Sequence, residues 1–297
     1  MRHEPYATLD ELLAPETLSR LSGAAVSSVR REPFVGGHSA SGSGFLALST
    51  NEGSGPRFVV KLSSPACDWI VRATGDTQGR EVLVWTSGLL DRLPPELTHP
   101  VLAGARDGAG WAILMRDVAA DLIPGQDRTF GAPISRQDHE RYLDGLAALH
   151  ATFWEAPELA DPTFGLCTSW CLYTSLSHET GHREAAHPNE IVRRIREGWE
   201  LLGTLIDPAM ADLLHRLAID PGPLCRALAR YPQTLVHGDP RAANLGIQRR
   251  PRPRVVLLDW HFVGPSVPAT DLAWYLDDHG YRVPMPLEES IARYRDR

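Results

Sequence analysis

One stretch, from Leu235 to Trp260, constrains the fold more than any other part of the chain. It reads LVHGDPRAANLGIQ, then a basic turn RRPRPR, then VVLLDW. Apolar residues lead into a tight His-Gly-Asp turn, and four residues separate Asp239 from Asn244. A β-branched and leucine-rich strand then ends on Asp259, so its side chain can face the same space as the other two. The stretch therefore predicts three oxygen-bearing side chains gathered beside a buried strand.

These side chains point to a particular chemistry. Two aspartates and an asparagine on short loops form an oxygen-ligand set that suits Mg²⁺ and leaves one carboxylate spare. Phosphoryl transfer needs both, because a metal ion holds the phosphates and a carboxylate orients the attacking hydroxyl. The stretch therefore favours a phosphotransferase, and the rest of the chain can be tested against that hypothesis.

The basic residues give the second strong signal. The chain has 30 lysine and arginine residues, and Lys61 is the only lysine among them. It lies in the apolar strand FVVKL. A compact ammonium on a flexible stem can reach phosphate oxygens from a buried strand where a guanidinium would not serve. Chance survival of one lysine is the alternative.

The first third of the chain predicts a small antiparallel sheet. Residues 8–22 have leucines at helical spacing, with Pro15 opening the second part of the helix. Residues 25–35 alternate like a strand, and the strands FLALS and RFVVKLS follow them. Two more strands are expected at 101–105 and 111–115.

A loop rich in glycine and serine, GGHSASGSG, joins the first two strands. Small residues let backbone N–H groups approach an anion, so Gly37, Ser39 and Ser41 are candidate phosphate contacts. The loop matches neither the P-loop nor the dinucleotide-binding fingerprint. A flexible hairpin tip is the alternative interpretation.

A helix is predicted over residues 76–93, with Val82, Trp85 and Leu89 near one apolar stripe. Packed on the sheet, it would offer Glu81 to Lys61, because a buried lysine needs a carboxylate partner to keep its charge. A solvated glutamate is the alternative.

The composition changes at residues 116–126, a short polar segment that contains proline and glycine. Helices dominate beyond it, over 135–154, 189–205 and 208–230, with Ser135, Asn189 and Asp207 as N-caps. The sequence thus predicts an α+β chain with a nucleotide-binding lobe (1–116), a linker (117–126) and a helical lobe with the catalytic and metal-binding loops (127–297).

Charge and composition exclude several classes. A net charge of −7 argues against nucleic acid as the partner, and the basic run at residues 249–254 is interpreted as a solvated turn. No apolar run is long enough to cross a membrane, and the N-terminus has no signal-peptide pattern, so we expect a cytoplasmic protein. Four scattered cysteines predict reduced thiols.

The sequence resembles the aminoglycoside phosphotransferase and choline kinase-like group of small-molecule kinases, and within it the ecdysteroid kinase-like branch. The motifs that carry the resemblance are HGDPRAAN, LLDW and DLAWYL, supported by FVVKL, the Arg80-Glu81 pair and LAALHATFW. They span roughly residues 25–280. The resemblance implies a protein kinase-like fold, ATP as cofactor, a small-molecule alcohol as acceptor and a monomer.

The resemblance also implies a role for each site residue. Asp239 would accept or orient the proton of the acceptor hydroxyl, and Asn244 and Asp259 would hold Mg²⁺. Lys61, fixed by Glu81, would bind the α- and β-phosphates.

Further roles concern the adenine and the transferred group. Backbone atoms near Met115, Asp117 and Val118 would hold the adenine at the hinge. Arg241 could neutralise charge on the transferring phosphoryl group, a hypothesis that rests on its position alone. His237 is expected to shape its turn rather than to transfer protons, because Asp239 already occupies the base position.

The sequence departs from the group's pattern in two places. His261 stands where Glu or Gln usually follows the Asp-Trp pair, and no glycine is present there, which makes a protein substrate less expected. Only 26 residues follow Asp271, which leaves open a trimmed C-terminal lobe or a fragment.

A competing interpretation rests on His178-Glu179-Thr180-Gly181-His182, a formal H-E-x-x-H motif. On a helix it would place His178 and His182 on one face for zinc, with Glu179 as general base and His187 as a possible third ligand. The segment has little apolar face and Pro188 ends it, so a polar segment between helices is preferred. A nucleotide-binding but inactive kinase relative is a third possibility.

The acceptor is left undetermined by the sequence. The helical lobe should supply its site, and four aromatic residues are candidates for the wall, although core packing is the preferred interpretation for each. They are Trp154, Trp170, Tyr173 and Trp199.

Overall fold

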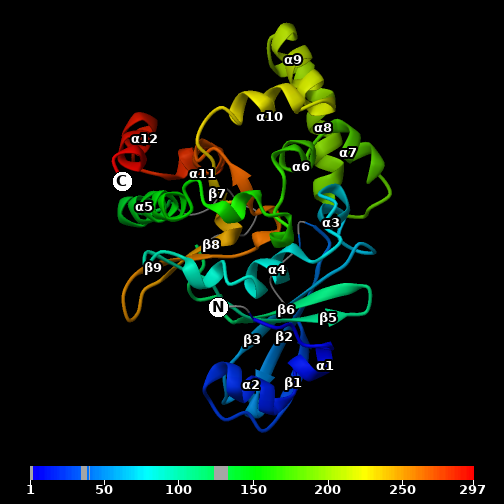
Figure 1. Ribbon diagram of the computed structural model, residues 1–297, viewed down its shortest axis with the longest axis vertical. Coiled ribbons are helices and arrows are strands. Elements are labelled where there is room, and N and C mark those ends of the chain that lie inside the picture. Colours follow the sequence, from blue (N-terminus) through cyan, green and yellow to red (C-terminus); the bar gives the residue numbers. More distant parts are fainter. Residues whose placement is uncertain (1–2, 35–38, 40, 124–132) are drawn as a thin grey trace.

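The computed structural model describes residues 3–34, 39, 41–123 and 133–297. Its N-terminal part is built on a five-stranded antiparallel sheet, whose strands lie in the order β1-β2-β3-β6-β5 (Figure 1). The strands are β1 (Val29–Pro33), β2 (Gly44–Thr50), β3 (Phe58–Ser63), β5 (Val101–Asp107) and β6 (Gly110–Arg116). The expected meander is confirmed, and the central strand β3 carries Lys61.

Short helices pack around this sheet. The chain begins with α1 (Leu9–Leu12) and α2 (Pro15–Ser22), and α2 opens at Pro15 as the sequence predicts. The helix α4 (Arg80–Thr86) packs on β5 and β6 and carries Glu81.

The helix expected over residues 76–93 is shorter than predicted. Gly79, with φ of 75°, precedes α4, and the carboxylate of Asp76 accepts from the N–H groups of Gly79 and Arg80 from outside the helix. After Thr86 the chain continues through a turn into a 3₁₀ helix, Leu90–Arg92. A second helix, α3 (Trp69–Ala73), was not predicted.

Two small sheets lie at the centre of the molecule (Figure 1). The strand β4 (Leu97–Thr98) pairs in parallel with β9 (Arg254–Leu257), which pairs in turn with β8 (Leu245–Gln248). The other sheet pairs β7 (Thr234–Val236) with β10 (Gly264–Ser266).

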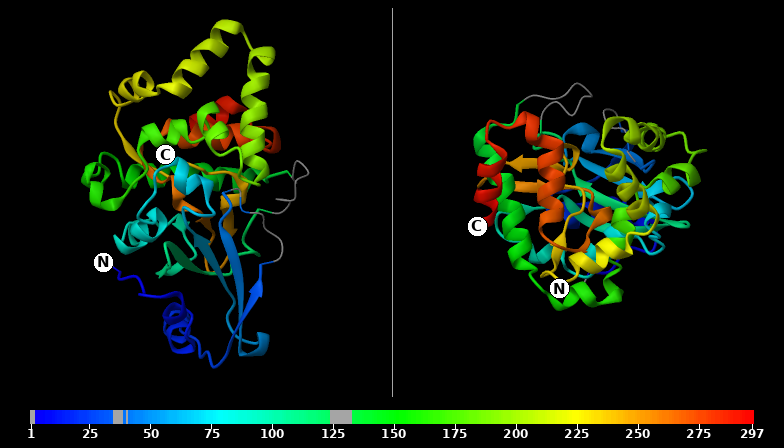
Figure 2. Two further views of the ribbon diagram at one scale, coloured as in Figure 1. Left: turned by 90° about the vertical axis from the view of Figure 1, so that its right-hand side faces the viewer. Right: turned by 90° about the horizontal axis from the view of Figure 1, so that it is seen from above.

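Helices form most of the C-terminal part (Figures 1 and 2). They are α5 (Arg136–Thr152), α6 (Ser169–Thr174), α7 (His178–Arg183), α8 (Glu190–Leu205), α9 (Pro208–Ile219), α10 (Gly222–Leu228), α11 (Ala269–His279) and α12 (Leu287–Arg295). Short 3₁₀ helices occur at Asn51–Gly53, Leu90–Arg92, Pro157–Ala160, Pro162–Phe164, Ala242–Asn244, Trp260–Phe262 and Gly280–Arg282.

The predicted N-caps are confirmed. The Ser135 hydroxyl and the Asn189 and Asp207 side chains accept from backbone N–H groups at the starts of α5, α8 and α9. The helix predicted over 208–230 is wrong in one respect, because the chain breaks at Asp220 and Pro221 into α9 and α10.

One hydrophobic core runs through the sheet and the helices around it. Val60 and Leu114 of the N-terminal sheet, Leu146 of α5 and Trp260 all belong to it and are almost fully buried. In the part of the chain that the structure describes, no helix is long and apolar enough to cross a membrane.

Candidate active site

Lys61 lies at the centre of a buried ion cluster. Its Nζ donates to Glu81 Oε2 at 2.7 Å and also to Asp259 Oδ1. The other carboxylate oxygen of Glu81 accepts from the N–H of Trp260 at 3.2 Å. The structure therefore brings together three predicted site residues that lie far apart in the sequence, and the solvated alternative for Glu81 does not describe its position.

The cluster shifts the pKa of each member. Burial alone would lower the pKa of Lys61, but the carboxylates of Asp259 and Glu81 outweigh it and raise that pKa well above its usual range. Burial likewise pushes the pKa of Asp259 upward, but His261 and Lys61 bring it well below its usual value. Lys61 and Asp259 are therefore a charged pair at neutral pH.

Asp239 and Asn244 form a hydrogen-bonded pair on the turn that follows β7. The Asn244 Nδ2 donates to Asp239 Oδ2 at 2.8 Å and to the Asp239 carbonyl at 2.9 Å. Arg241 Nε donates to the same Oδ2 at 3.1 Å. Among the described residues no group donates to Asp239 Oδ1, so this oxygen can accept from another molecule.

The register of the β8–β9 hairpin explains why Asn244 lies beside the ion cluster. Leu245 pairs with Leu257, and the N–H of Leu258 donates to the Asn244 carbonyl at 2.9 Å. Asn244 and Asp259 consequently flank the same end of the hairpin. Asp259 has φ of 64°, a left-handed conformation that aspartate tolerates better than most residues.

His261 contacts Asp259 directly. Its Nδ1 lies 2.6 Å from Asp259 Oδ1, and the carboxylate raises the pKa of the imidazole against the lowering effect of burial. The residue that departs from the group's pattern is thus part of the charge cluster.

The turn of His237, Gly238 and Asp239 is held by Asp271, a fully buried residue of α11 that opens the DLAWYL motif. Its carboxylate accepts from the N–H groups of His237 at 2.7 Å and Gly238 at 2.8 Å, and faces His150 Nε2 at 3.2 Å. Burial raises the pKa of Asp271, but these contacts bring it below its usual value.

His237 is fully buried within the turn. Its Nε2 donates to the Leu258 carbonyl at 2.8 Å, while Nδ1 accepts from the Asp239 N–H at 3.3 Å. Burial lowers the pKa of the imidazole. This geometry fits the turn-shaping role expected for His237.

The serine-rich turn, of which residues 39 and 41–43 are described, comes directly before β2. Ser39 Oγ accepts from the N–H groups of Ser41 at 3.3 Å and Gly42 at 3.0 Å, and Ser41 Oγ accepts from the N–H of Ser43 at 3.3 Å. Three neighbouring backbone donors are therefore paired with serine hydroxyls, which a phosphate could replace. Gly37, the other predicted loop contact, lies outside the described residues.

The predicted hinge residues connect the two parts of the chain. Met115 pairs with Val59 and Val101 within the sheet, and the Asp117 N–H donates to the Arg57 carbonyl at 3.1 Å. Val118 is buried.

Beyond Val118 the chain pairs with β8. The N–H of Ile123 donates to Leu245, and that of Ile247 donates to Asp121. The linker predicted over 117–126 is thus partly a strand-like edge, and residues 124–126 lie outside the described part.

The H-E-x-x-H segment forms the short helix α7, rather than a segment between helices. His178 and His182 are exposed, with Nε2 atoms 2.9 Å apart, but His187 Nε2 binds the Cys67 carbonyl at 2.9 Å. Within the described residues no three His, Cys, Asp or Glu side chains are arranged to hold a metal ion. The geometry does not favour the zinc hydrolase.

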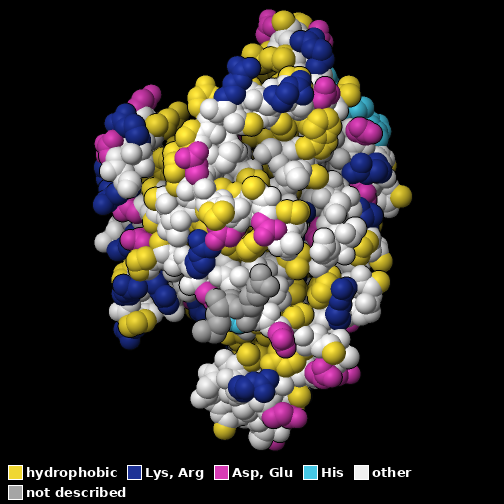
Figure 3. All heavy atoms as spheres, viewed as in Figure 1, with side chains coloured by type: hydrophobic (Ala, Val, Ile, Leu, Met, Phe, Trp, Pro, Cys, Tyr) yellow, Lys and Arg dark blue, Asp and Glu magenta, His cyan; other side chains and the backbone are white. Residues whose placement is uncertain are grey.

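The aromatic candidates differ in exposure. Trp154 and Trp170 are 48% and 46% exposed, so the core packing expected for both is wrong. Trp199 is half-buried and donates to the Leu176 carbonyl at 2.8 Å, and Tyr173 lies 3.5 Å from the Thr270 hydroxyl. Figure 3 shows many apolar side chains over the projecting helices α8–α10, where Leu205 and Ile219 are the most exposed.

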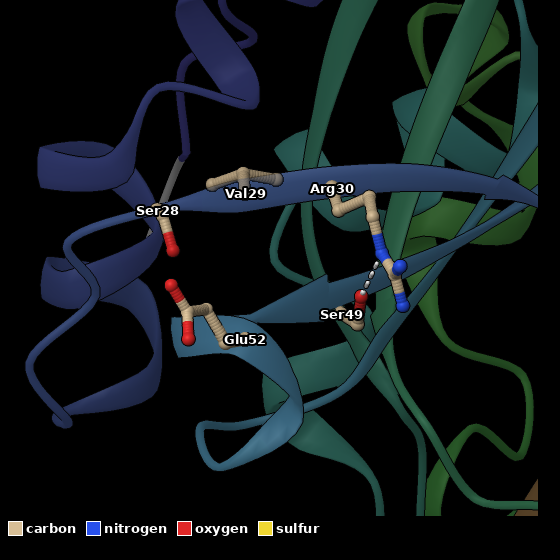
Figure 4. Close-up of a pocket in the computed structure, with 5 residues that line it drawn as sticks. All are labelled: Ser28, Val29, Arg30, Ser49 and Glu52. Atoms are coloured by element: carbon tan, nitrogen blue, oxygen red, sulfur yellow. Dashed lines mark hydrogen bonds between the residues drawn. The ribbon is translucent and has the colours of Figure 1, made fainter.

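An open depression lies at the outer end of the N-terminal sheet, away from this site (Figure 4). Its lining residues are Ser28, Val29, Arg30, Ser49 and Glu52. Ser49 lies four residues along β2 from Phe45, the partner of Lys61, so about 13 Å separates the two places. The depression contains none of the predicted site residues.

The fold and the site together define a phosphotransferase with the protein kinase-like fold, in which a strand lysine and a helix glutamate meet the carboxylate of Asp259. Residues 37–297 match the Phosphotransferase enzyme family. The chain belongs to this family, and the predicted membership in the group of small-molecule kinases is confirmed.

Solved structures confirm the fold. A choline kinase from Streptococcus pneumoniae matches 96% of this chain and 79% of its own, with a TM-score of 0.50 and 16% identity. An aminoglycoside phosphotransferase from Streptomyces rimosus, solved with ADP and streptomycin, matches 96% and 90%, with a TM-score of 0.50 and 20% identity. A Plasmodium vivax ethanolamine kinase matches 97% and 70%, with a TM-score of 0.51 and 14% identity. No curated protein matches the sequence significantly.

Sequence reasoning missed several residues that position the site. Asp271 was only part of a motif, and Arg80 only the neighbour of Glu81. Arg80 is buried, and its guanidinium donates to the carbonyls of His261 at 2.5 Å and Gly165 at 2.9 Å. An arginine at the start of a helix whose later residues are mostly apolar was the available signal.

Proposed function

We propose that the chain transfers the γ-phosphoryl group of ATP to a hydroxyl of a small molecule. The observation that carries the proposal is the free carboxylate oxygen of Asp239, held by Asn244 beside the cluster of Lys61, Glu81 and Asp259. The membership in a phosphotransferase family supports it.

In this reaction the acceptor oxygen forms a bond to the γ-phosphorus while the bond from phosphorus to the β,γ-bridging oxygen breaks. The acceptor proton passes to the Asp239 carboxylate, and ADP leaves. Asp239 would orient the hydroxyl through Oδ1, since Oδ2 is held by Asn244 and Arg241. Lys61 would turn from Asp259 toward the α- and β-phosphates and keep its contact with Glu81.

The donor set fits a magnesium ion. Within the described residues, the Asn244 amide oxygen and Asp259 Oδ2 take no hydrogen bond, and both are the hard oxygen ligands that Mg²⁺ prefers. Asn244 and Asp259 would hold the ion, which supplies charge neutralisation across the phosphates when bound. Lys61 supplies the positive charge beside Asp259 without it.

The remaining contacts follow from the same orientation. The serine-rich turn, with Ser39 and Ser41, would cover the phosphates through its backbone N–H groups. Asp117 and Val118 would present backbone atoms to the adenine. Arg241 would leave Asp239 to neutralise the transferring group, and unchanged kcat in Arg241→Ala would contradict that role.

The acceptor is proposed to be an alcohol of the kind that related kinases phosphorylate, and the monomeric state and the ecdysteroid kinase-like branch stay predictions. A screen of ATP consumption across aminoglycosides, choline-like amines, sugars, nucleosides and hydroxylated lipids would identify the class. Absence of turnover with every acceptor would favour the inactive nucleotide-binding relative.

The substitution Asp239→Asn tests the mechanism once an acceptor is found. It removes the base but keeps the hydrogen-bonding shape, so kcat should fall by at least about 100-fold while ATP still binds. Asp277→Asn is the matched control, because Asp277 is an exposed aspartate elsewhere on the chain. Full activity in Asp239→Asn would mean that the assigned mechanism is wrong.

A further inference from the structure

Asp68 joins the serine-rich turn to the helix α3. Its Oδ2 accepts from the Ser41 hydroxyl at 2.8 Å and from the Ser43 hydroxyl. Its Oδ1 accepts from the N–H groups of Ile70 at 2.9 Å and Val71 at 3.1 Å, which caps α3. Asp68 is only 3% exposed, so one buried carboxylate fixes both the turn and the start of the helix.

The backbone reinforces this connection. The N–H of Trp69 donates to the Ser41 carbonyl at 2.9 Å. A side chain at Gly42, which has φ of 94°, would collide with the Cys67 carbonyl 2.3 Å away. The turn and the segment before α3 are therefore packed directly on each other.

The other side of α3 packs on the C-terminal part of the chain. Trp69 and Ile70 form a separate hydrophobic cluster with Cys167, Val192 and Phe262. Figure 1 shows α3 beside the lower ends of α7 and α8, whereas the strands of the N-terminal sheet lie away from these helices. The helix α3, which lies between β3 and α4 in the sequence, thus packs on helices that come more than 100 residues later in the chain.

Polar contacts reinforce the packing of α3 on the C-terminal part of the chain. Arg72 of α3 donates to Glu184 Oε2 through Nε at 3.0 Å and through Nη2 at 2.5 Å. The Glu184 side chain is 7% exposed, so this pair is less screened by water than a surface pair. His187 binds the Cys67 carbonyl at 2.9 Å, and Asn189 Nδ2 donates to the Ser39 carbonyl at 2.7 Å.

We propose that the phosphate-binding turn of this enzyme is positioned by the C-terminal helices through α3, with Asp68 as the positioning residue and Arg72–Glu184 as the ion pair that holds α3 in place. The inference rests on the proposed function, because it takes the turn to contact nucleotide phosphates. A turn that is held in its binding conformation loses less conformational freedom when the nucleotide binds. The affinity for ATP therefore depends on the packing of α3 on the C-terminal helices.

Charge reversal tests the ion pair on the full chain. Arg72→Glu and Glu184→Arg each place like charges together, and the dissociation constant for ATP, measured by calorimetry, should rise at least about three-fold in each. The double variant restores opposite charges and should recover most of the affinity. Arg194→Glu is the control, because it breaks an exposed pair with Glu190 on α8.

Asp68→Asn tests the positioning residue. The amide keeps the size of the side chain but binds two hydroxyls and two N–H groups less well. KM for ATP should rise several-fold with a smaller change in kcat, a split that general destabilisation would not produce. Circular dichroism checks folding, and Arg72→Gln and Glu184→Gln replace the reversals if those fail to fold.

The outcomes separate the inference from the function it rests on. Unchanged ATP affinity in both single reversals, or a double variant no better than either single one, would overturn the inference alone. Wild-type protein that binds no nucleotide would overturn the proposed function and the inference with it.

Discussion

Lys61 is the only lysine of the chain, and it separates two carboxylates that would otherwise repel each other. Without its ammonium, the buried Glu81 and Asp259 would keep only the Trp260 N–H and the His261 side chain, respectively, as compensating partners. The cluster therefore contributes to stability as well as to the proposed nucleotide contact.

Lys61→Met should lower the free energy of unfolding by about 3 kcal/mol at neutral pH. The depressed pKa of Asp259 in the wild type means that its share of the stability persists to pH 4 and is lost only below the ordinary carboxylate pKa. In the variant the two carboxylates lose the neighbouring ammonium, so their pKa values rise and they take up protons as the pH falls, which relieves their repulsion. The difference between wild type and variant should consequently shrink toward pH 4. Urea unfolding at pH 4 and pH 7 measures it, and a difference that grows at low pH would contradict the assignment.

The site residues that the sequence could predict share one property. Asp239, Asn244 and Asp259 lie within one short stretch, so spacing alone indicated their proximity. The sequence did not identify Asp271 and Asp68 as supports of the site. Their contacts with the two turns span 25 or more residues, and nothing in the sequence pairs these positions. Lys61 and Glu81 were found through the rarity of lysine, not through any pattern that fixes their distance.

At the scale of elements, length decided what could be predicted. An alternating apolar pattern can be recognised in the strands β2, β3 and β6, which are long enough to show it. A helical apolar pattern and an N-cap can likewise be recognised in α5 and α8. α3 has five residues and β4 has two, which is too short for any periodicity. Both are held by tertiary contacts, and both connect the N-terminal part to the C-terminal part.

The turn of His237, Gly238 and Asp239 depends on a glycine at its centre. Gly238 has φ of 83°, and a Cβ there would lie 2.6 Å from the Phe262 carbonyl. Gly238→Ala should therefore destabilise the protein by about 2 kcal/mol or more and reduce activity.

Gly203 in α8 provides the matched control, since a Cβ there meets nothing within 4 Å. Gly203→Ala should raise the free energy of unfolding by about 0.5 to 1 kcal/mol through helix propensity. Thermal unfolding of both variants compares them, and equal effects would show that the turn tolerates a side chain.

At the scale of the whole molecule, a buried histidine joins three helices of the C-terminal part. His139 of α5 lies between the Tyr275 hydroxyl of α11 at 2.8 Å and the Ser290 hydroxyl of α12 at 2.9 Å. Burial lowers its pKa to about 4.

This histidine should make the protein sensitive to acid. Below its ordinary pKa of 6.5 the unfolded chain takes up a proton that the folded chain does not, so stability falls between pH 6.5 and about 4. The slope from this group is at most about 1.4 kcal/mol per pH unit. Urea unfolding across this range measures the slope, and His139→Gln should reduce it while lowering stability at pH 7; His99, whose pKa burial also lowers, contributes to the slope that remains.

The parallel pairing of β4 with β9 has a consequence for synthesis on the ribosome. Leu97 of β4 pairs with Val255 of β9, so β4 has no partner strand until about 160 further residues have been synthesised. At ordinary rates of translation that interval is roughly 8 to 30 seconds. During that time β4 is unpaired and α3 lacks the helices on which it packs. We expect a chaperone to bind at these two segments of the nascent chain.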